Sequence, residues 1–327
     1  MGNSNYILII VLWSMFLCVG EVCAQESMHS QSVVKQEYLN PAYNSFKDYS
    51  SVNFLSRNQW SGVGSSPKLY GANCYVPLQI SRMGVGLTLL KEEIGLRDIT
   101  MINASFTNNI RIKERSFLSF GYGLGMNFTA YDQDRIIAMD NSYLGSDIDW
   151  TSFDPAIKLG LFYTDPHIFA GVSCNTVIGG VSGDRWYLPG FDFVAGSMHR
   201  LSPSVFFRPD LVVKYYRSEQ YNVTETVVNK DYVPPVCDLS VSFLLYERVW
   251  LSTSRRFNLA HTFSLDVLVT ANLQVGYSFE LGIGDGLNQF NSNGISFSYR
   301  INKGNALGGF QKEVRYNYGG QFKYLYR

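Results

Sequence analysis

The sequence predicts an all-β fold, a transmembrane antiparallel β-barrel of about 14 strands with a periplasmic N-terminal segment and a C-terminal tail. Large apolar residues occupy every second position from Leu118 to Phe128, and the positions between them are Ser, Gly or Asn. Successive side chains of a strand point to opposite faces, so this segment has one apolar face and one small or polar face. The pattern recurs from Tyr70 to Ile301 with almost no helical period, and the chain begins with a candidate export signal.

Composition favours a membrane barrel over a water-soluble β-protein. Charged residues make up 17% of the chain and aromatic residues 15%, with 22 Tyr. A pair of soluble β-sandwiches would explain the alternation equally well, but its exterior faces would normally carry more charge. Membrane barrels turn alternate residues toward lipid and place Tyr and Trp at the membrane interfaces. A lipid bilayer is therefore the expected surrounding, and the formal net charge of zero predicts no nucleic-acid partner.

The N-terminus has the features of a secretory signal peptide over residues 1–24. An apolar stretch from Tyr6 to Val19 precedes Val22 and Ala24, which suit the −3 and −1 positions of a cleavage site after Ala24. No Lys or Arg precedes the stretch, so a single membrane anchor is the alternative. Such an anchor needs about 20 apolar residues, more than this stretch has.

The remaining chain divides into three parts. Residues 25–49 are polar and without regular alternation, and we expect them to form an N-terminal periplasmic or plug segment. Residues 50–302 predict the barrel, and residues 303–327 form a basic, Tyr-rich tail that is either an extra terminal strand or a periplasmic arm. The alternation places candidate strands at Ser51–Asn58, Tyr70–Leu78, Val85–Leu89, Ile99–Ile112, Leu118–Phe128, Asp154–Tyr163, Ile168–Thr176, Phe191–Met198, Val205–Tyr216, Tyr221–Tyr232, Asp238–Tyr246, Arg248–Ser254, Thr262–Ala271, Ala271–Ile283 and Ile295–Ile301.

The connections between these segments follow from turn residues and polarity. Lys91–Gly95 is expected as a short connection, Lys113–Arg115 as a charged turn and Ala130–Asp149 as a long polar loop. A Gly-rich loop is expected over Gly179–Gly190. Because bacterial barrels of this class have even strand numbers with both ends in the periplasm, we predict 14 strands.

No motif in the sequence predicts catalysis, a cofactor or a metal site. Three cysteines follow the expected cleavage site, and an odd number cannot form a complete set of disulfides. They are Cys74, Cys174 and Cys237, and each lies on the apolar side of its strand. The acidic residues of 130–149 lack the spacing and closing Glu of an EF-hand loop. Gly282–Gly286 resembles a nucleotide loop but leads into no helix, and no Gly-x-Ser-x-Gly elbow occurs. We therefore expect a protein that is not an enzyme and has no cofactor.

Several segments together resemble the PorP/SprF family of Bacteroidota outer-membrane proteins of the type IX secretion system. The chain departs from the family pattern at Asn291–Gly294 and in the length of the tail after Asn302. The segments that carry the resemblance are Tyr38–Tyr43, Arg57–Gly62, Ser66–Lys68, Gly84–Leu87, Ile94–Gly95, Leu118–Gly125, Phe153–Tyr163 and Ile168–Ser173.

The resemblance implies a non-enzymatic outer-membrane barrel. It would dock or anchor a secreted surface protein through that protein's C-terminal sorting domain, and would contact other components of the secretion machine. Gliding motility, adhesion and protease export all remain open as the process served. An outer-membrane pore for small solutes is the alternative function.

Two of the segments that carry the resemblance, Asn40–Tyr43 and Arg57–Trp60, have residues suited to recognition of a partner or to plugging of the barrel. Trp and Arg are enriched at binding hot spots, and Asn and Tyr side chains can fix a turn and bond a neighbour. The structural alternative is that Trp60 belongs to an interfacial girdle and Pro41 forms a turn. The predicted partner-binding residues are Asn40, Pro41, Tyr43, Arg57, Gln59 and Trp60.

Overall fold

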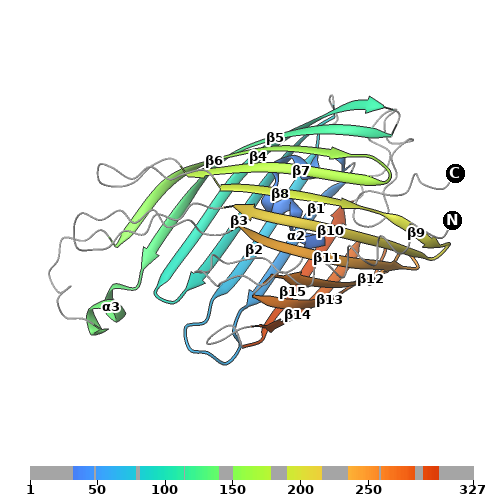
Figure 1. The fold of residues 1–327 in the computed structure, drawn as a ribbon. Helices are drawn as coiled ribbons and strands as arrows, with labels where there is room; N and C mark the ends of the chain where they lie inside the picture. The colour runs from blue at the N-terminus through green and yellow to red at the C-terminus, as the bar shows by residue number, and fades with distance from the viewer. Residues whose placement is uncertain are drawn as a thin grey trace.

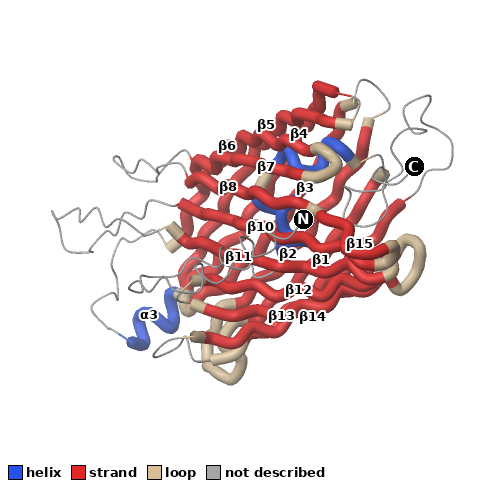
Figure 2. The backbone as a smooth tube through the Cα atoms, turned by 45° about the vertical axis from the view of Figure 1, so that its right-hand side comes forward, coloured by secondary structure: helices blue, strands red, loops and turns tan. Residues whose placement is uncertain are grey.

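The computed structural model describes residues 32–47, 49–78, 82–113, 115–139, 150–177, 190–215, 235–257, 259–283 and 290–301. These residues form one antiparallel sheet that closes on itself into a barrel (Figures 1 and 2). Within these ranges no helix is both long and apolar enough to cross a bilayer.

The barrel wall has 14 strands, as predicted. Strand β1 pairs with β15 and β10 pairs with β11, which closes the ring. The short strands β8 and β9 both pair with β10, so they form one interrupted strand of the wall. The strands are β1 (Ser50–Asn58), β2 (Lys68–Pro77), β3 (Met83–Ile94), β4 (Arg97–Lys113), β5 (Ser116–Tyr131), β6 (Thr151–Thr164), β7 (Ile168–Val177), β8 (Gly190–Ser197), β9 (His199–Ser202), β10 (Val205–Tyr215), β11 (Val236–Leu245), β12 (Val249–Arg256), β13 (Ala260–Leu268), β14 (Leu273–Gly282) and β15 (Ser292–Ile301).

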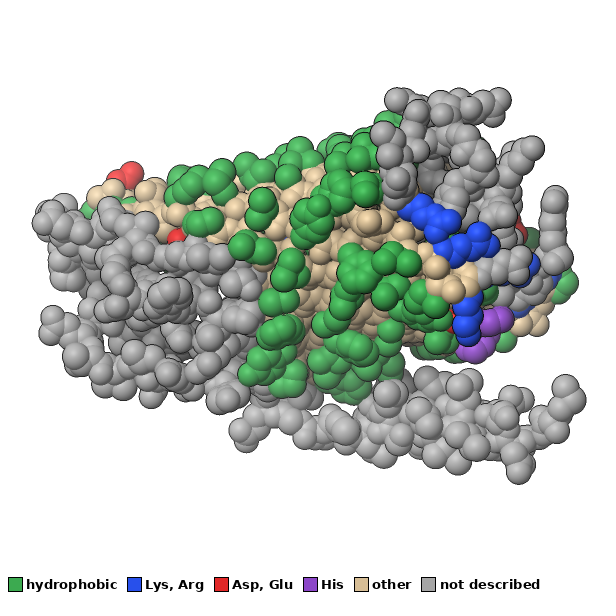
Figure 3. All heavy atoms as spheres, turned by 90° about the horizontal axis from the view of Figure 1, so that it is seen from above, with side chains coloured by type: hydrophobic (Ala, Val, Ile, Leu, Met, Phe, Trp, Pro, Cys, Tyr) green, Lys and Arg blue, Asp and Glu red, His purple; other side chains and the backbone are tan. Residues whose placement is uncertain are grey.

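The alternation in the sequence separates the outer wall from the interior. On β5, Phe120 and Leu124 face outward and are 39% and 67% exposed, whereas Ser119 faces inward and is completely buried. The same division runs around the barrel, and Figure 3 shows the resulting band of hydrophobic side chains. Apolar side chains therefore cover the outside, and small or polar ones line the lumen, as expected for a wall in contact with lipid.

The two ends of the barrel differ in their connections. The strands that flank the long connections 59–67, 132–150, 178–189 and 216–235 end or begin at the same end of the barrel, called here the long-loop end. Turns such as 203–204 and 246–248 lie at the other, the short-turn end. Strand β1 starts and β15 stops at the short-turn end (Figure 1), so both ends of the barrel are there, as the even strand number requires.

Two predicted connections are wrong. Lys91–Gly95 is not a connection, because β3 continues to Ile94 and the chain reverses at Gly95, which has a φ of 63°. Ala130–Asp149 is not loop throughout: β5 continues to Tyr131 and a helix, α3 (Gln133–Met139), follows. Asp132 accepts a hydrogen bond from the backbone N–H of Arg135 at 3.2 Å and so caps this helix.

Other predicted segments lie outside the described residues. They are the signal peptide, the Gly-rich loop, the strand at Tyr221–Tyr232 and the tail at 303–327. The wall closes without residues 221–232, because β10 and β11 pair directly from Val205–Leu245 to Lys214–Val236.

Candidate functional site in the barrel interior

A segment of the chain that precedes the first strand lies inside the barrel. It consists of α2 (Ser32–Leu39) and a 3₁₀ helix, η1 (Pro41–Phe46), and residues 32–47 are called here the interior segment. Figures 1 and 2 show these helices within the ring of strands, and η1 packs against β4, β5 and β6. Burial agrees, since Tyr38 is 3% exposed and Ala42 is fully buried.

Asn40 shapes the interior segment and ties it to the wall. Its side-chain oxygen accepts a hydrogen bond from the N–H of Ala42 at 2.9 Å, which caps η1, and Pro41 occupies the first helical position. Its Nδ2 donates to the backbone carbonyls of Leu161 on β6 and Val172 on β7, at 3.0 and 3.2 Å. One side chain therefore both starts a helix and anchors it to two strands.

Glycines in the wall make room for the segment. A Cβ added to Gly121 on β5 would collide with the backbone of Pro41 and Ala42. A Cβ added to Gly160 on β6 would collide with the side-chain oxygen of Asn40. Glycine at these inward positions thus permits the interior segment to lie closer to the wall than a larger residue would allow.

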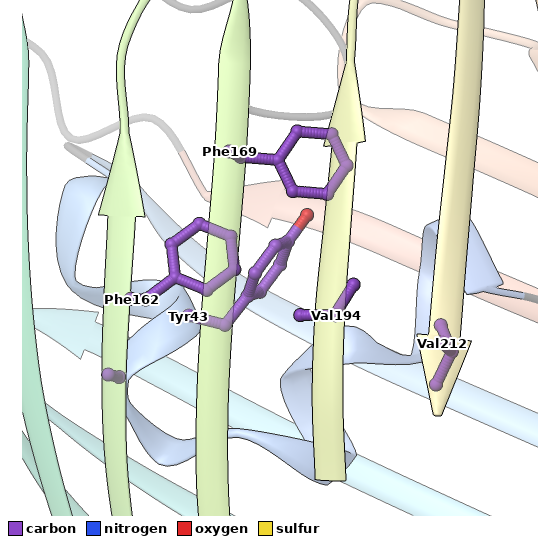
Figure 4. Packing of buried hydrophobic residues seen from close by; sticks show 6 residues of the cluster. Tyr43, Phe162, Phe169, Val194 and Val212 are labelled. Carbon is purple, nitrogen blue, oxygen red and sulfur yellow. The ribbon is translucent and has the colours of Figure 1, made fainter. Parts of the chain in front are cut away.

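Aromatic packing secures the same contact (Figure 4). Tyr43 meets Phe162 edge to face with 5.2 Å between ring centroids, and Phe162 stacks with Phe169 at 6.1 Å. Val194 and Val212, on β8 and β10, complete the cluster. Burial raises the pKa of the Tyr43 phenol, so this side chain stays neutral in the interior.

A buried ion pair joins the end of the interior segment to its first helix, α2. Nζ of Lys47 lies 2.8 Å from a carboxylate oxygen of Glu37, and both side chains are buried. Burial alone would lower the pKa of Lys47, but the negative charge of Glu37 and its hydrogen bond outweigh it and raise the pKa above its ordinary value. The lysine therefore stays charged and holds α2 against the end of η1.

A second group of buried charges lies along one side of the inner wall toward the long-loop end and is called here the ionic layer. Nη2 of Arg57 on β1 lies 2.6 Å from Glu280 on β14. Arg256 on β12 lies 3.7 Å from Glu280 and 3.7 Å from Asp238 on β11. Gln59 accepts a hydrogen bond from Arg57 at 3.0 Å. The layer thus links four strands by charge on the inner face.

Small residues on β15 allow Arg57 to reach its partner. Arg57 stands opposite Gly294, and Glu280 stands opposite Ser292, so β15 separates the two charges. The inward side chains of β15 at these positions are a hydrogen and a hydroxymethyl group. The long guanidinium side chain reaches past these small side chains to Glu280 on the next strand.

Further buried groups occupy the lumen below the ionic layer. Arg208 on β10 lies 3.4 Å from Asp210 and sits over the ring of Phe169, 4.6 Å from its centroid. Nearer the short-turn end, Met198, Phe206, Leu244 and Trp250 form an apolar cluster. The interior is thus occupied by ionic, polar and apolar groups at successive levels.

The predicted partner-binding residues fall into three places. Asn40, Pro41 and Tyr43 belong to the interior segment, Arg57 and Gln59 to the ionic layer, and all five are buried. Trp60 lies at the long-loop rim, partly exposed, with a φ of 52°. The backbone N–H of Trp60 donates to Oγ of Ser292 at 3.3 Å, and the backbone N–H of Ser61 donates to the carbonyl of Asn291 at 2.7 Å. The binding role of these residues stays a prediction.

Sequence reasoning missed the partners of these residues. Glu280 and Asp238 lie on the polar side of the predicted strands, Arg256 lies beyond the predicted strand Arg248–Ser254, and Gly121 belongs to the alternating pattern. The signal that was present is a charged residue on the inward parity of a strand, where Ser, Gly or Asn is usual. In the part of the chain that the structure describes, no group of three His, Cys, Asp or Glu residues is placed to hold a metal ion.

Comparisons with known proteins agree with this architecture. The sequence model of the type IX secretion system membrane protein PorP/SprF matches residues 22–301. A search of curated proteins gave no match. Among solved structures, the CymD monoaromatic hydrocarbon channel is 11% identical, with 83% of this chain and 93% of that chain covered and a TM-score of 0.50. The toluene transporter TodX of Pseudomonas putida is 12% identical, with 87% and 100% covered and a TM-score of 0.49.

At such identities the structural likeness shows the barrel fold alone. The family match covers nearly the whole chain, including the interior segment and every strand of the wall. This protein belongs to the PorP/SprF family of type IX secretion system membrane proteins.

Proposed function

We propose that the protein is a non-enzymatic outer-membrane barrel that docks or anchors a secreted surface protein through its C-terminal sorting domain. In this proposal the signal peptide is removed after Ala24, the short-turn end faces the periplasm and the long-loop end faces outward. Residues 32–47 act as a plug, and the barrel contacts other parts of the type IX machine.

The occupied interior is the observation that carries the proposal. The interior segment is anchored to β6 and β7 through Asn40, and the ionic layer adds buried charges on the inner face of β11, β12, β14 and β1. A conducting pore needs a water-filled path with binding weak enough for release. Buried, mutually bonded charges and a packed helix favour a rigid platform over a path for solutes.

The short-turn end offers a surface for a periplasmic partner. Figure 3 shows basic side chains and histidine gathered toward this end of the face in view. Among the described residues there, Asp165 and Glu247 are the acidic ones, and the basic ones outnumber them: Arg82, Arg111, Lys113, Arg115, Arg200 and Arg248. A positive surface attracts and orients an acidic partner, so this collar suits a machine component of opposite charge.

At the long-loop end the partner-binding residues act in two ways in this proposal. Trp60 contacts the secreted protein at the rim. Asn40, Pro41, Tyr43, Arg57 and Gln59 support that rim and the plug from within. The backbone hydrogen bonds from Trp60 to Ser292 and from Ser61 to Asn291 support this division, because they hold the 59–67 connection against the start of β15.

Gentle-detergent purification from the native outer membrane, followed by mass spectrometry, tests the proposal. We expect a secreted protein with a C-terminal sorting domain and periplasmic machine components to co-purify. Arg111→Gln with Lys113→Gln should lose periplasmic partners, while Lys68→Gln with Lys91→Gln at the long-loop end should keep them. A solitary barrel in the wild type would count against docking.

The pore alternative has its own readout. The similar structures are named as a hydrocarbon channel and a toluene transporter, so transport of small solutes is the second candidate. Purified protein in planar bilayers should show little ion conductance if residues 32–47 plug the lumen, and deletion of 32–47 should raise it. Steady conductance or solute uptake by the wild type would favour the pore.

A further inference from the structure

The outer wall carries a groove in the band that faces lipid. It lies over β11 to β14, has a volume of about 390 Å³ and is lined mainly by apolar side chains. Val241, Thr253, Phe263 and Phe279 form one row across these strands, and Phe243, Leu251, Leu265 and Tyr277 form the next. The volume falls within the range of small-molecule sites.

Two polar side chains lie in the next row toward the long-loop end. Arg255 pairs with His261, one step beyond the Thr253–Phe263 pair and on the same outward face. Both side chains are partly exposed. An apolar groove therefore ends, on the side of the long loops, at a guanidinium and an imidazole.

Hydrogen bonding and ring packing hold His261 in place. Its Nε2 lies 2.9 Å from Oγ1 of Thr253, and its ring centroid lies 4.8 Å from that of Phe263. When Thr253 donates to Nε2, the hydrogen of the neutral ring is on Nδ1, which can then donate to an anion. The ring thus links a residue of the groove to the cationic row.

Arg255 differs from the other outward cations at this end. Lys91 lies 2.9 Å from Glu93 and 3.8 Å from Asp98, and Lys68 lies 3.9 Å from Glu93. Among the described residues no carboxylate lies within ion-pair distance of Arg255. A cation beside lipid is costly without a counter-charge, so a charge from outside the chain would complete this site.

We propose that this groove binds lipid A, the phosphorylated glycolipid of the outer leaflet, with an acyl chain in the groove and a phosphate on Arg255 and His261. Arg binds phosphate through paired N–H donors, and the apolar rows bury the chain. The proposal rests on the outer-membrane orientation given above but not on docking of a secreted protein.

Native mass spectrometry of the full-length barrel, delipidated in mild detergent and titrated with bisphosphorylated lipid A, tests the site. We expect saturable binding that weakens about tenfold or more in Arg255→Gln, because a charge-assisted contact is lost. Val241→Phe should weaken it as well by filling the groove. Lys91→Gln, which removes a paired cation at the same end, should bind like the wild type.

Two further ligands test whether binding depends on the phosphates of lipid A and on its acyl chains. Dephosphorylated lipid A should bind as weakly to the wild type as bisphosphorylated lipid A binds to Arg255→Gln. Phosphatidylglycerol, with one phosphate and two chains, should compete poorly. Equal binding by wild type and Arg255→Gln, or equal competition by phosphatidylglycerol, would overturn the proposal. Heat-modifiable migration on gels confirms that each variant is folded, and unchanged co-purification of the secreted protein would leave the docking function intact.

Discussion

The guanidinium of Arg57 on β1 lies 2.6 Å from the carboxylate of Glu280 on β14 and crosses β15 to reach it. The two residues are 223 positions apart in the chain. Their contact joins the first strand of the barrel to its last hairpin on the lumen side. It thus reinforces the seam where β1 and β15 close the ring.

Removal of the charge on Glu280 should destabilise the barrel strongly. Glu280→Gln leaves Arg57 and Arg256 buried without their shared counter-charge, and breaking a buried pair costs about 3–5 kcal/mol. We expect the urea midpoint of unfolding in lipid vesicles, followed by heat-modifiable migration, to fall. Glu93→Gln, at an exposed pair with Lys91, should change stability by about 1 kcal/mol or less. Equal midpoints for the two variants would show that the ionic layer does not hold the wall.

Gly121 controls the seating of the interior segment. Gly121→Val would drive a side chain into the backbone of Pro41 and Ala42. We expect the interior segment to leave its seat while the wall stays closed. Labelling of Ala42→Cys by a soluble maleimide would measure this, in a background with the native cysteines replaced by alanine. Labelling should be slow with Gly121 and fast with Gly121→Val.

The matched control for this experiment is Gly123→Val. Gly123 lies two residues along β5 on the same inward face, but a Cβ there meets the side-chain amide of Asn103, not the interior segment. Labelling of Ala42→Cys should therefore stay slow. Fast labelling in both variants would point to general loosening of the wall, and slow labelling in both would contradict the seat.

The two roles of Asn40 can be separated by substitution. Asn40→Ala loses the cap and both bonds to the wall, whereas Asn40→Asp keeps an oxygen that can cap η1 but cannot donate to Leu161 and Val172 when ionised. A lost hydrogen bond costs about 1 kcal/mol, and a buried group left unsatisfied costs about 1–3 kcal/mol. We expect amide hydrogen exchange over 32–47 to accelerate about tenfold or more in Asn40→Ala.

Asn40→Asp should exchange at least as fast as Asn40→Ala, because a carboxylate would face two backbone carbonyls. If Asn40→Asp matched the wild type, the cap alone would account for the role of Asn40. The bonds to β6 and β7 would then contribute little.

Lys47 gives a pH dependence with a definite sign. Its pKa is raised in the folded protein, despite burial, by the charge of Glu37. The ion pair therefore contributes its full stabilisation of the folded state at any pH below about 10.4, the lysine pKa in the unfolded chain. This stabilisation is lost as the pH rises through the pKa of Lys47 in the folded protein. Deprotonation of Lys47 should therefore not increase the rate at which proteinase K cleaves the interior segment between pH 7 and 10. Lys47→Met should be cleaved faster throughout this range, and equal rates would show that the ion pair is not needed.

The alternation of apolar and polar residues was sufficient to locate a strand where one face of that strand meets lipid. The alternation from Leu118 to Phe128 located most of β5 because each outward residue had to be apolar independently of the others. The pattern failed at Lys91–Ile94, where outward residues are charged and the alternation of hydrophobicity stops although pairing with β4 continues. It also failed at Gln133–Met139, because the capping role of Asp132 is a single local bond within a polar stretch.

The site was predictable only in its local parts. The turn at Asn40–Tyr43 follows from an Asn–Pro pair that starts a helix, which is a property of neighbouring residues. The carbonyls to which Asn40 donates belong to residues more than 100 positions away, and no spacing in the sequence points to them. The same holds for Arg57 and Glu280, which are 223 positions apart and meet across a third strand, β15.

The sequence by itself determined that this chain is a barrel with an apolar outside and a small, polar inside, because that division is repeated residue by residue along each strand. Only the tertiary structure decided what fills the inside and what the outside holds. The places of the interior segment and of the ionic layer depend on closure of the ring, whereas the groove beside Arg255 depends on the register of four consecutive strands. Closure brings together side chains from strands that share no local pattern, and their contacts exist only in the folded barrel.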